Sequence, residues 1–233
     1  PENLTQVSDL MNDGKADVGY VVDPDGDRWA IVMENGEMFV EEYTLVAVAD
    51  YILRHTPGAT VSNLSSSRAL GDVTRSYGCE YHASAVGEVN VVAKMKETGA
   101  VIGGEGNGGV IYPEAHYGRD ALVGVAIFLT LLAKSGKKVS ELKKEYPSYA
   151  IAKNKIELTP DINVDAILCA MKERYADEKI TDMDGVKIDF QDSWVHLRKS
   201  NTEPIIRIYA EAPTMAAAER LGEKVKSVIA SLA

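Results

Sequence analysis

The hydrophobic positions of this chain follow two alternating patterns over its first 147 residues. Short runs rich in Val and Ile have the composition of strands, and the longer segments between them repeat apolar residues at three and four positions, as helices do. We expect strands at 18–22, 29–33, 60–62, 100–103 and 110–113. We expect helices at 41–55, 67–77, 86–98, 119–134 and 139–146. This alternation predicts an α/β domain with a mixed, mostly parallel sheet and helices.

The pattern changes after 147–149, Pro-Ser-Tyr, which we interpret as a linker. Beyond it, we expect strands at 150–158, 185–190, 194–198 and 205–210, and helices at 164–175 and 216–232. This order predicts an α+β C-terminal domain with an antiparallel sheet and helices on one side. We therefore divide the chain into residues 1–40, 41–147 and 148–233.

Charge and composition narrow the functional classes. The formal net charge is -10 at pH 7, which argues against a nucleic-acid partner because such proteins carry a basic face. The apolar run at 121–133 is too short for a membrane span, which needs about 20 residues, and we interpret it as a buried core helix. Cys79 and Cys169 show no CxxC spacing, so we expect buried or idle thiols and a cytoplasmic setting.

Three carboxylates alternate along the first loop of interest, at Asp23, Asp25 and Asp27, with Arg28 next to them. Such a loop can curl around one hard cation. The alternative is a solvated turn that binds nothing. An EF-hand would explain Glu34 at the twelfth position, but it needs Gly where Arg28 stands, and it needs helices on both sides. An open Mg²⁺ site, with Arg28 close to a phosphate, fits the pattern better.

The second loop, 103–109, contains five glycines in seven residues and follows a predicted strand. It matches neither the dinucleotide-binding pattern nor the P-loop. Its two other residues, Glu105 and Asn107, suit hydrogen bonding to neighbouring sugar hydroxyls, since a carboxylate accepts and an amide both donates and accepts. A flexible turn is the alternative interpretation.

The third loop, 198–204, lies between two arginines, Arg198 and Arg207. Its small hydroxyl and amide side chains could complete a phosphate cradle around the arginine forks. These side chains are Ser200, Asn201 and Thr202. The same residues are also ordinary in turns, but the flanking arginines favour phosphate. We expect Lys199 to point away from the phosphate.

Taken in this order, the three loops resemble those of the α-D-phosphohexomutase superfamily. DPDGDR at 23–28 resembles its metal loop, GEGNGG at 104–109 its sugar loop, and RKSNTEPIIRIY at 198–209 its C-terminal phosphate loop. The resemblance covers essentially the whole chain. It implies a Mg²⁺-dependent transfer of phosphate between C1 and C6 of a hexose phosphate, through a phosphoserine and a hexose 1,6-bisphosphate intermediate.

The superfamily has four domains, and the resemblance assigns residues 1–40 to the end of the second, 41–147 to the third and 148–233 to the fourth. The first domain, which carries the phosphoserine, has no counterpart here, so we expect the chain alone to be inactive. The GEGNGG loop with HYGRD after it favours the phosphoglucosamine mutase-like branch. The alternatives are a phosphomannomutase/phosphoglucomutase, an inactive sugar-phosphate-binding module, and an unrelated Ca²⁺- or nucleotide-binding protein.

Some relatives have His where this chain has Gly109, and Glu88 also departs from their pattern. A proton must still leave the attacking hydroxyl, and a side chain with a pKa near neutrality suits that task. One hypothesis is that His116 folds back toward the sugar loop and acts as the acid or base. The other is that His116 packs on Tyr117 or caps the helix that begins near Arg119.

Overall fold

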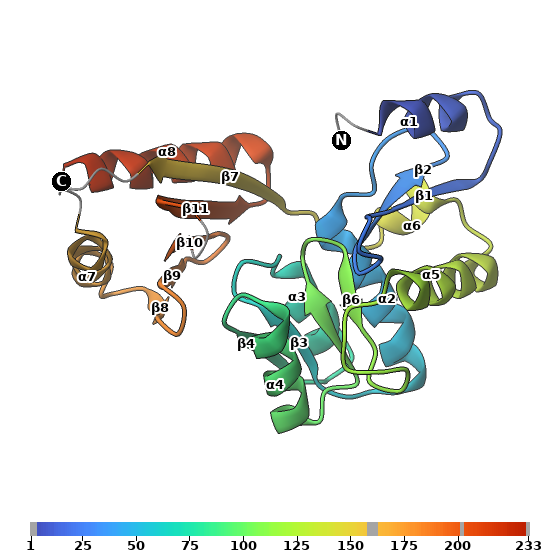
Figure 1. The fold of residues 1–233 in the computed structure, drawn as a ribbon, viewed down its shortest axis with the longest axis horizontal. Helices are drawn as coiled ribbons and strands as arrows, with labels where there is room; N and C mark the ends of the chain where they lie inside the picture. Colours follow the sequence, from blue (N-terminus) through green and yellow to red (C-terminus); the bar gives the residue numbers. More distant parts are fainter. Residues whose placement is uncertain (1–3, 158–162, 201–202, 232–233) are drawn as a thin grey trace. The chain divides into compact units, whose positions relative to one another are not determined.

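The computed structural model describes residues 4–157, 163–200 and 203–231 (Figure 1). The chain divides into two compact units, Pro1–Pro147 and Ser148–Ala233, which are described one at a time. Leu158 and Leu232, each the last residue of a predicted element, lie outside the described residues.

The first unit is built on a four-stranded sheet in the order β4-β3-β5-β6. β3 (Thr60–Asn63) pairs in parallel with β4 (Tyr81–Ser84) and with β5 (Ile102–Glu105), and β6 (Gly109–Ile111) returns antiparallel to β5. The predicted mixed, mostly parallel sheet is therefore confirmed. Its central strand β3 is buried along its whole length, because a parallel sheet is covered on both faces.

Helices surround this sheet, and Figure 1 shows α4 beside β3 and β4. Val91 and Met95 of α4 pack into a buried cluster with Val61 of β3. α2 contacts α3, α5 and strand β5. The helices of this part of the unit are α2 (Glu41–His55), α3 (Ala69–Ser76), α4 (Glu88–Thr98), α5 (Ala121–Ser135) and α6 (Val139–Lys143).

The sequence predicts that the apolar helix α5 is a buried core helix, but in the structure only one side of it is buried. Phe128 is fully buried and meets the rings of Trp29 and Phe39 edge to face, whereas Leu122 and Leu129 are exposed. The helix begins two residues later than predicted, because the Asp120 carboxylate accepts the Val123 N–H as an N-cap. No helix within the described ranges is long and apolar enough to cross a membrane.

A short hairpin precedes the main sheet of the first unit. β1 (Val18–Val22) pairs antiparallel with β2 (Trp29–Met33), and the acidic loop connects them. The polar helix α1 (Thr5–Asn12) contacts both strands and was not predicted, since Met11 is its one buried residue. β4 was also missed, because only its last residue is fully buried.

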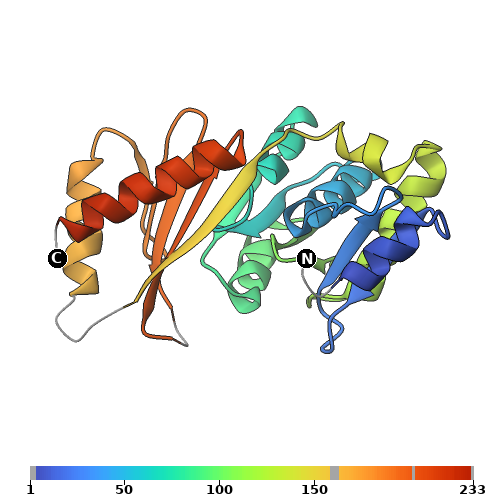
Figure 2. The same cartoon turned by 90° about the horizontal axis from the view of Figure 1, so that it is seen from above.

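The second unit contains a five-stranded antiparallel sheet in the order β7-β11-β10-β9-β8. The strands are β7 (Ala150–Glu157), β8 (Lys179–Thr181), β9 (Val186–Asp189), β10 (Trp194–Lys199) and β11 (Ile205–Ala212). α7 (Val164–Arg174) and α8 (Met215–Ala230) complete the unit, and Figure 2 shows α8 running along the sheet. The short strand β8 was not predicted.

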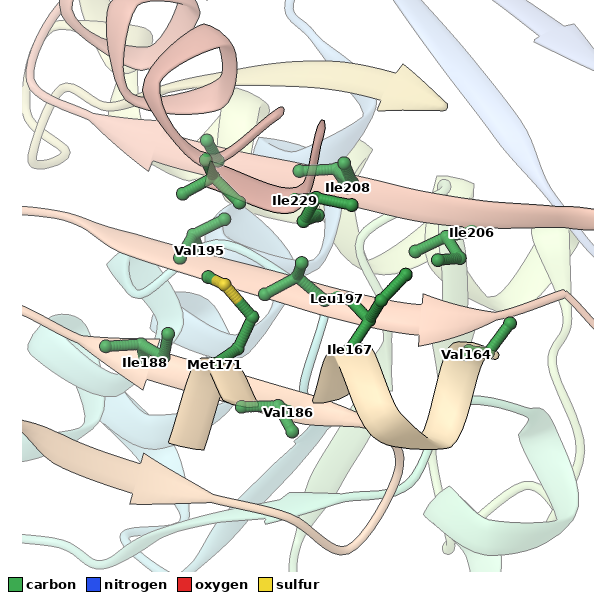
Figure 3. Close-up of a cluster of buried hydrophobic side chains, with 12 residues drawn as sticks. Val164, Ile167, Met171, Val186, Ile188, Val195, Leu197, Ile206, Ile208 and Ile229 are labelled. Atoms are coloured by element: carbon green, nitrogen blue, oxygen red, sulfur yellow. The ribbon is translucent and has the colours of Figure 1, made fainter. Parts of the chain in front are cut away.

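Both helices pack on the same face of this sheet. Figure 3 shows the side chains of Ile167 and Met171 of α7 extending toward β10, which carries Val195 and Leu197, and Val186 of β9 belongs to the same cluster. Ile229 of α8 joins the same buried cluster. The strand residues in this cluster alternate along each strand, which places them on one face. The predicted α+β unit with helices on one side is therefore confirmed.

Candidate functional site

The acidic loop curls so that its three aspartates come together. One carboxylate oxygen from each of Asp23, Asp25 and Asp27 lies within 4.8 Å of the others. Asp23 Oδ1 accepts the backbone N–H groups of Asp27 and Arg28, both at 3.2 Å, and these bonds close the turn. The flanking elements are strands, and the Glu34 carboxylate accepts hydrogen bonds from Ser140 instead. The EF-hand alternative is therefore wrong.

The Arg28 side chain contacts two aspartates of the acidic loop. Its Nε donates to Asp23 Oδ2 at 2.9 Å and lies 3.7 Å from Asp27 Oδ1. Although desolvation opposes the change, hydrogen bonds from Arg28 lower the pKa of Asp23 to about 2. Burial raises the pKa of Asp27, and the adjacent Asp23 raises it further, while Arg119 opposes the shift. The contribution of Asp23 to the raised pKa of Asp27 follows from two negative charges held close together.

The two oxygens of the Asp27 carboxylate have different surroundings. Oδ2 lies 2.5 Å from Arg119 NH2. Oδ1 is buried, has no hydrogen-bond partner among the described residues, and has a 3.7 Å charge contact with Arg28 Nε. A buried oxygen without a donor is costly, and a bound cation would remove that cost. The donor set consists of carboxylate oxygens, which Mg²⁺ prefers. The residues therefore fit a Mg²⁺ ion.

The glycine loop lies against the acidic hairpin. Trp29, the first residue of β2 after the acidic loop, donates its N–H to Gly108 O of the glycine loop at 3.3 Å. Ala121, the first residue of α5, donates its N–H to Gly26 O of the acidic loop at 3.1 Å. Glu105 is the last residue of β5 and not a mobile loop residue. The structure thus brings the first and second predicted loops together within one unit.

The Glu105 carboxylate is 5% exposed and holds neighbouring segments in place. Its Oε1 accepts Asn63 Nδ2 at 2.6 Å and Gly87 N at 3.1 Å. Its Oε2 accepts Arg119 NH1 at 2.7 Å, and Asn107 Nδ2 lies 3.5 Å away, at the limit of a hydrogen bond. Asn107 itself is exposed, and its Oδ1 accepts the Gly109 N–H.

Arg119 is the residue of this site that the sequence did not reveal. Besides Asp27 and Glu105, it pairs with Glu88, whose Oε2 lies 3.3 Å from Arg119 Nε. A Cβ atom on Gly109 would lie 2.4 Å from Arg119 Cδ, so the glycine leaves room for the arginine. The available signal was a basic residue after the glycine loop in an acidic chain, but it was interpreted only as a helix start.

His116 is bound to the N-cap of α5. Its Nε2 lies 2.9 Å from Asp120 Oδ2, and this hydrogen bond lowers the pKa of Asp120 together with the bond from Val123 N. The His116 side chain is half exposed. Asp120, and not His116, therefore caps α5, and His116 is hydrogen-bonded to the capping carboxylate.

The third predicted loop belongs to the second unit, between β10 and β11. Arg198 and Arg207 are directly opposite each other in the ladder, so their side chains emerge on the same face. Arg198 Nε is buried without a hydrogen-bond partner among the described residues, and Arg207 pairs with Glu203 at 2.7 Å. Ser200 is buried, and its N–H bonds to Ile205 O.

Asn201 and Thr202, the remaining predicted phosphate ligands, lie outside the described residues. His196, two residues before Arg198, is a buried core residue whose Nε2 lies 2.6 Å from Asp184 O. Burial lowers the pKa of His196 to about 4, so it is neutral near pH 7.

Two family models match consecutive parts of the chain. The model described as phosphoglucomutase/phosphomannomutase, alpha/beta/alpha domain III, matches residues 41–149, and the C-terminal domain model of the same family matches residues 150–228. A phosphoglucomutase/phosphomannomutase of Thermococcus kodakarensis is 38% identical, covering 91% of this chain and 46% of the relative. A "probable phosphoglucosamine mutase" of Methanopyrus kandleri is 33% identical, covering 98% and 51%.

Solved structures of the same family share the fold. A phosphoglucomutase/phosphomannomutase family protein of Burkholderia thailandensis has a TM-score of 0.86 and 26% identity, covering 100% of this chain and 50% of its own. The N-acetylphosphoglucosamine mutase of Aspergillus fumigatus, solved with GlcNAc-6P and magnesium, has a TM-score of 0.65 at 15% identity, covering 91% and 48%. The chain spans about half the length of the relatives it matches. It belongs to the phosphoglucomutase/phosphomannomutase family of the α-D-phosphohexomutase superfamily.

Proposed function

We propose that the full-length protein is a phosphohexomutase that moves phosphate between C1 and C6 of a hexose phosphate, and that its main substrate is a glucosamine phosphate. The observation that carries the phosphohexomutase proposal is the Arg119 side chain, which pairs with Asp27 of the acidic loop and with Glu105 of the glycine loop. Asp27 Oδ1 has no hydrogen-bond partner among the described residues and could bind a cation. The choice of glucosamine is supported by the relative named phosphoglucosamine mutase. The reaction would use a phosphoserine supplied by the rest of the protein and a hexose 1,6-bisphosphate intermediate.

Asp23, Asp25 and Asp27 would hold Mg²⁺, which when bound supplies positive charge that stabilises the transferring phosphoryl oxygens. Asp25 is exposed, so it needs no rearrangement to reach a cation. Arg28 would keep Asp23 ionised and would also contact the phosphate. It can turn toward a phosphate because its side chain is 47% exposed.

Glu105 and Asn107 would bind the sugar hydroxyls. The hydrogen bond between them is stretched to 3.5 Å, so a sugar hydroxyl can replace the Asn107 amide at Glu105 Oε2. The exposed Asn107 then turns its amide to a second hydroxyl. We propose that His116 holds the capping residue Asp120 in place, outside the reacting atoms, on the basis of its bond to the Asp120 carboxylate.

Arg198 and Arg207 would hold the non-transferring phosphate, with Ser200, Asn201 and Thr202 completing the cradle. The buried Arg198 Nε supports this role, because a phosphate oxygen would satisfy its unpaired donor. The hexose phosphate and the magnesium in the Aspergillus fumigatus structure are consistent with these partners.

The test is an assay of the full-length protein with glucosamine, glucose and mannose 6-phosphates in the presence of Mg²⁺ and the matching 1,6-bisphosphate. We expect the highest kcat/KM for the glucosamine phosphate, and we expect Asp25→Asn to abolish turnover. Preferential turnover of glucose or mannose phosphate would favour the phosphoglucomutase/phosphomannomutase alternative, as in the Thermococcus relative. Binding of sugar phosphate without any turnover would favour an inactive binding module.

A further inference from the structure

A single guanidinium connects the acidic loop to the glycine loop. We propose that Arg119 is a positioning residue, which holds Asp27 and Glu105 at a fixed separation so that the cation site and the sugar site form together. This inference rests on the proposed function of the two loops, and it assigns Arg119 no contact with the reacting atoms.

The guanidinium divides its nitrogen atoms between the loops. NH2 lies 2.5 Å from Asp27 Oδ2, and NH1 lies 2.7 Å from Glu105 Oε2. A planar fork with donors in fixed directions can hold both carboxylates at once, whereas the single ammonium of a lysine cannot match this geometry. The Arg119 side chain is 18% exposed, so both contacts are shielded from solvent.

Two further features fix the position of the fork. Glu88 contacts Arg119 twice: its Oε1 accepts the Arg119 backbone N–H at 3.0 Å, and its Oε2 forms an ion pair with Nε at 3.3 Å without a hydrogen bond. Gly109 leaves open the space through which the side chain passes, because an added Cβ would lie 2.4 Å from Cδ. Arg119 is therefore constrained at its backbone, along its stem and at its tip.

This constraint determines which Asp27 oxygen is available. Because Arg119 occupies Oδ2, a cation would bind the buried Oδ1, which has no hydrogen-bond partner among the described residues and lies 3.7 Å from Arg28 Nε. Without Arg119, the Asp27 carboxylate could rotate. Oδ1 could then find another donor, and a cation would no longer be needed to stabilise it. Asp27, Glu88 and Glu105 also outnumber the one guanidinium, so the cluster keeps a net negative charge that attracts a divalent ion.

The key variant is Arg119→Lys in the full-length protein, because it keeps the charge and changes only the geometry. Mn²⁺ serves as the probe, and its affinity at the acidic loop is measured by electron paramagnetic resonance as the binding that Asp25→Asn removes. We expect Arg119→Lys to weaken Mn²⁺ affinity and raise the KM for glucosamine 6-phosphate, each about ten-fold, the size of a charged hydrogen bond. The control is Arg75→Lys, which changes an exposed pair with Asp72 and should alter neither value.

Mn²⁺ affinity and KM within about two-fold of wild type in folded Arg119→Lys would overturn the proposal. A rise in Mn²⁺ affinity would also overturn it, since Arg119 would then be a competitor of the cation. If this variant fails to fold, Gly109→Ala offers a second test, because it displaces the arginine stem and keeps every charged group. The same two losses are expected from it, and wild-type values in that variant would count equally against Arg119.

Failure of the proposed function would appear differently. If wild type bound Mn²⁺ no better than Asp25→Asn, the acidic loop would not be a cation site, whatever the result for Arg119.

Discussion

Asp50 on α2 is the centre of a buried hydrogen-bond network in the first unit. Its Oδ1 accepts Tyr77 OH at 2.6 Å, and its Oδ2 accepts Tyr146 OH at 3.2 Å and Arg54 NH2 at 2.5 Å. Burial raises the pKa of both tyrosines, and the Asp50 charge raises them further, so both hydroxyls stay protonated as donors. Tyr146 is the second-last residue of the first unit, so the network fixes the end of this unit to α2.

The cost of Asp50→Ala can be estimated from these contacts. Removal of the carboxylate leaves the two hydroxyls without their acceptor, and each hydrogen bond to a charged group is worth about 1.5–3 kcal/mol. The long Tyr146 bond belongs at the low end, and the half-exposed Arg54 recovers its partner from water. We therefore expect a loss of about 4 kcal/mol in the free energy of unfolding, within the range for broken buried pairs. Asp50→Asn should lose about half as much, because it keeps one acceptor.

Urea unfolding followed by fluorescence measures this loss in the first unit alone. The chain has two tryptophans, so a Trp194→Phe background leaves Trp29 as the reporter of that unit. Glu97→Ala is the matched control, since it breaks a pair with Lys94 at 2.8 Å in which Glu97 is 65% exposed. The control should cost less than about 1 kcal/mol. Equal losses for Asp50→Ala and Glu97→Ala would refute the reasoning.

Three further predictions concern the site. Asp25→Asn should weaken Mg²⁺ binding about ten-fold or more by calorimetry, because it removes a charged ligand; unchanged affinity would contradict the cation assignment. In the full-length enzyme, Arg198→Ala should cost about 1.5–3 kcal/mol in kcat/KM and Lys199→Ala much less, and equal losses would mean that the loop is misread. His116→Gln should lower the free energy of unfolding by less than about 1 kcal/mol and leave kcat near wild type. A lost pH limb near neutrality in this variant would instead support catalysis by His116.

Local sequence patterns were enough to predict most of the helices and strands. Helix α2 has the predicted bounds, 41–55, because its apolar period is continuous and Pro57-Gly58 follows it. The elements missed were short or polar, such as α1 and β8, in which few side chains are buried. A periodicity argument detects burial, so it cannot detect elements that bury little.

The acidic loop could be anticipated because its three aspartates lie within five consecutive residues, Asp23 to Asp27. The role of Arg119 could not be predicted from the sequence, because its partners Asp27 and Glu88 are distant along the chain. They meet Arg119 only once the helices and strands have packed together. The glycines next to Glu105 predict a loop at this position. In the structure its carboxylate is buried and hydrogen-bonded to Asn63 and Arg119, which belong to other segments. Pairings of this kind depend on tertiary structure and leave no local pattern.

The close approach of Gly109 to the Arg119 stem has an evolutionary consequence. A side chain at position 109 and the arginine stem at position 119 compete for the same volume, so a side chain at 109 would displace the arginine from its present position. Substitutions at the two positions should therefore covary across the family. A protein that exchanged only the glycine would lose the link between its two loops before it acquired any replacement.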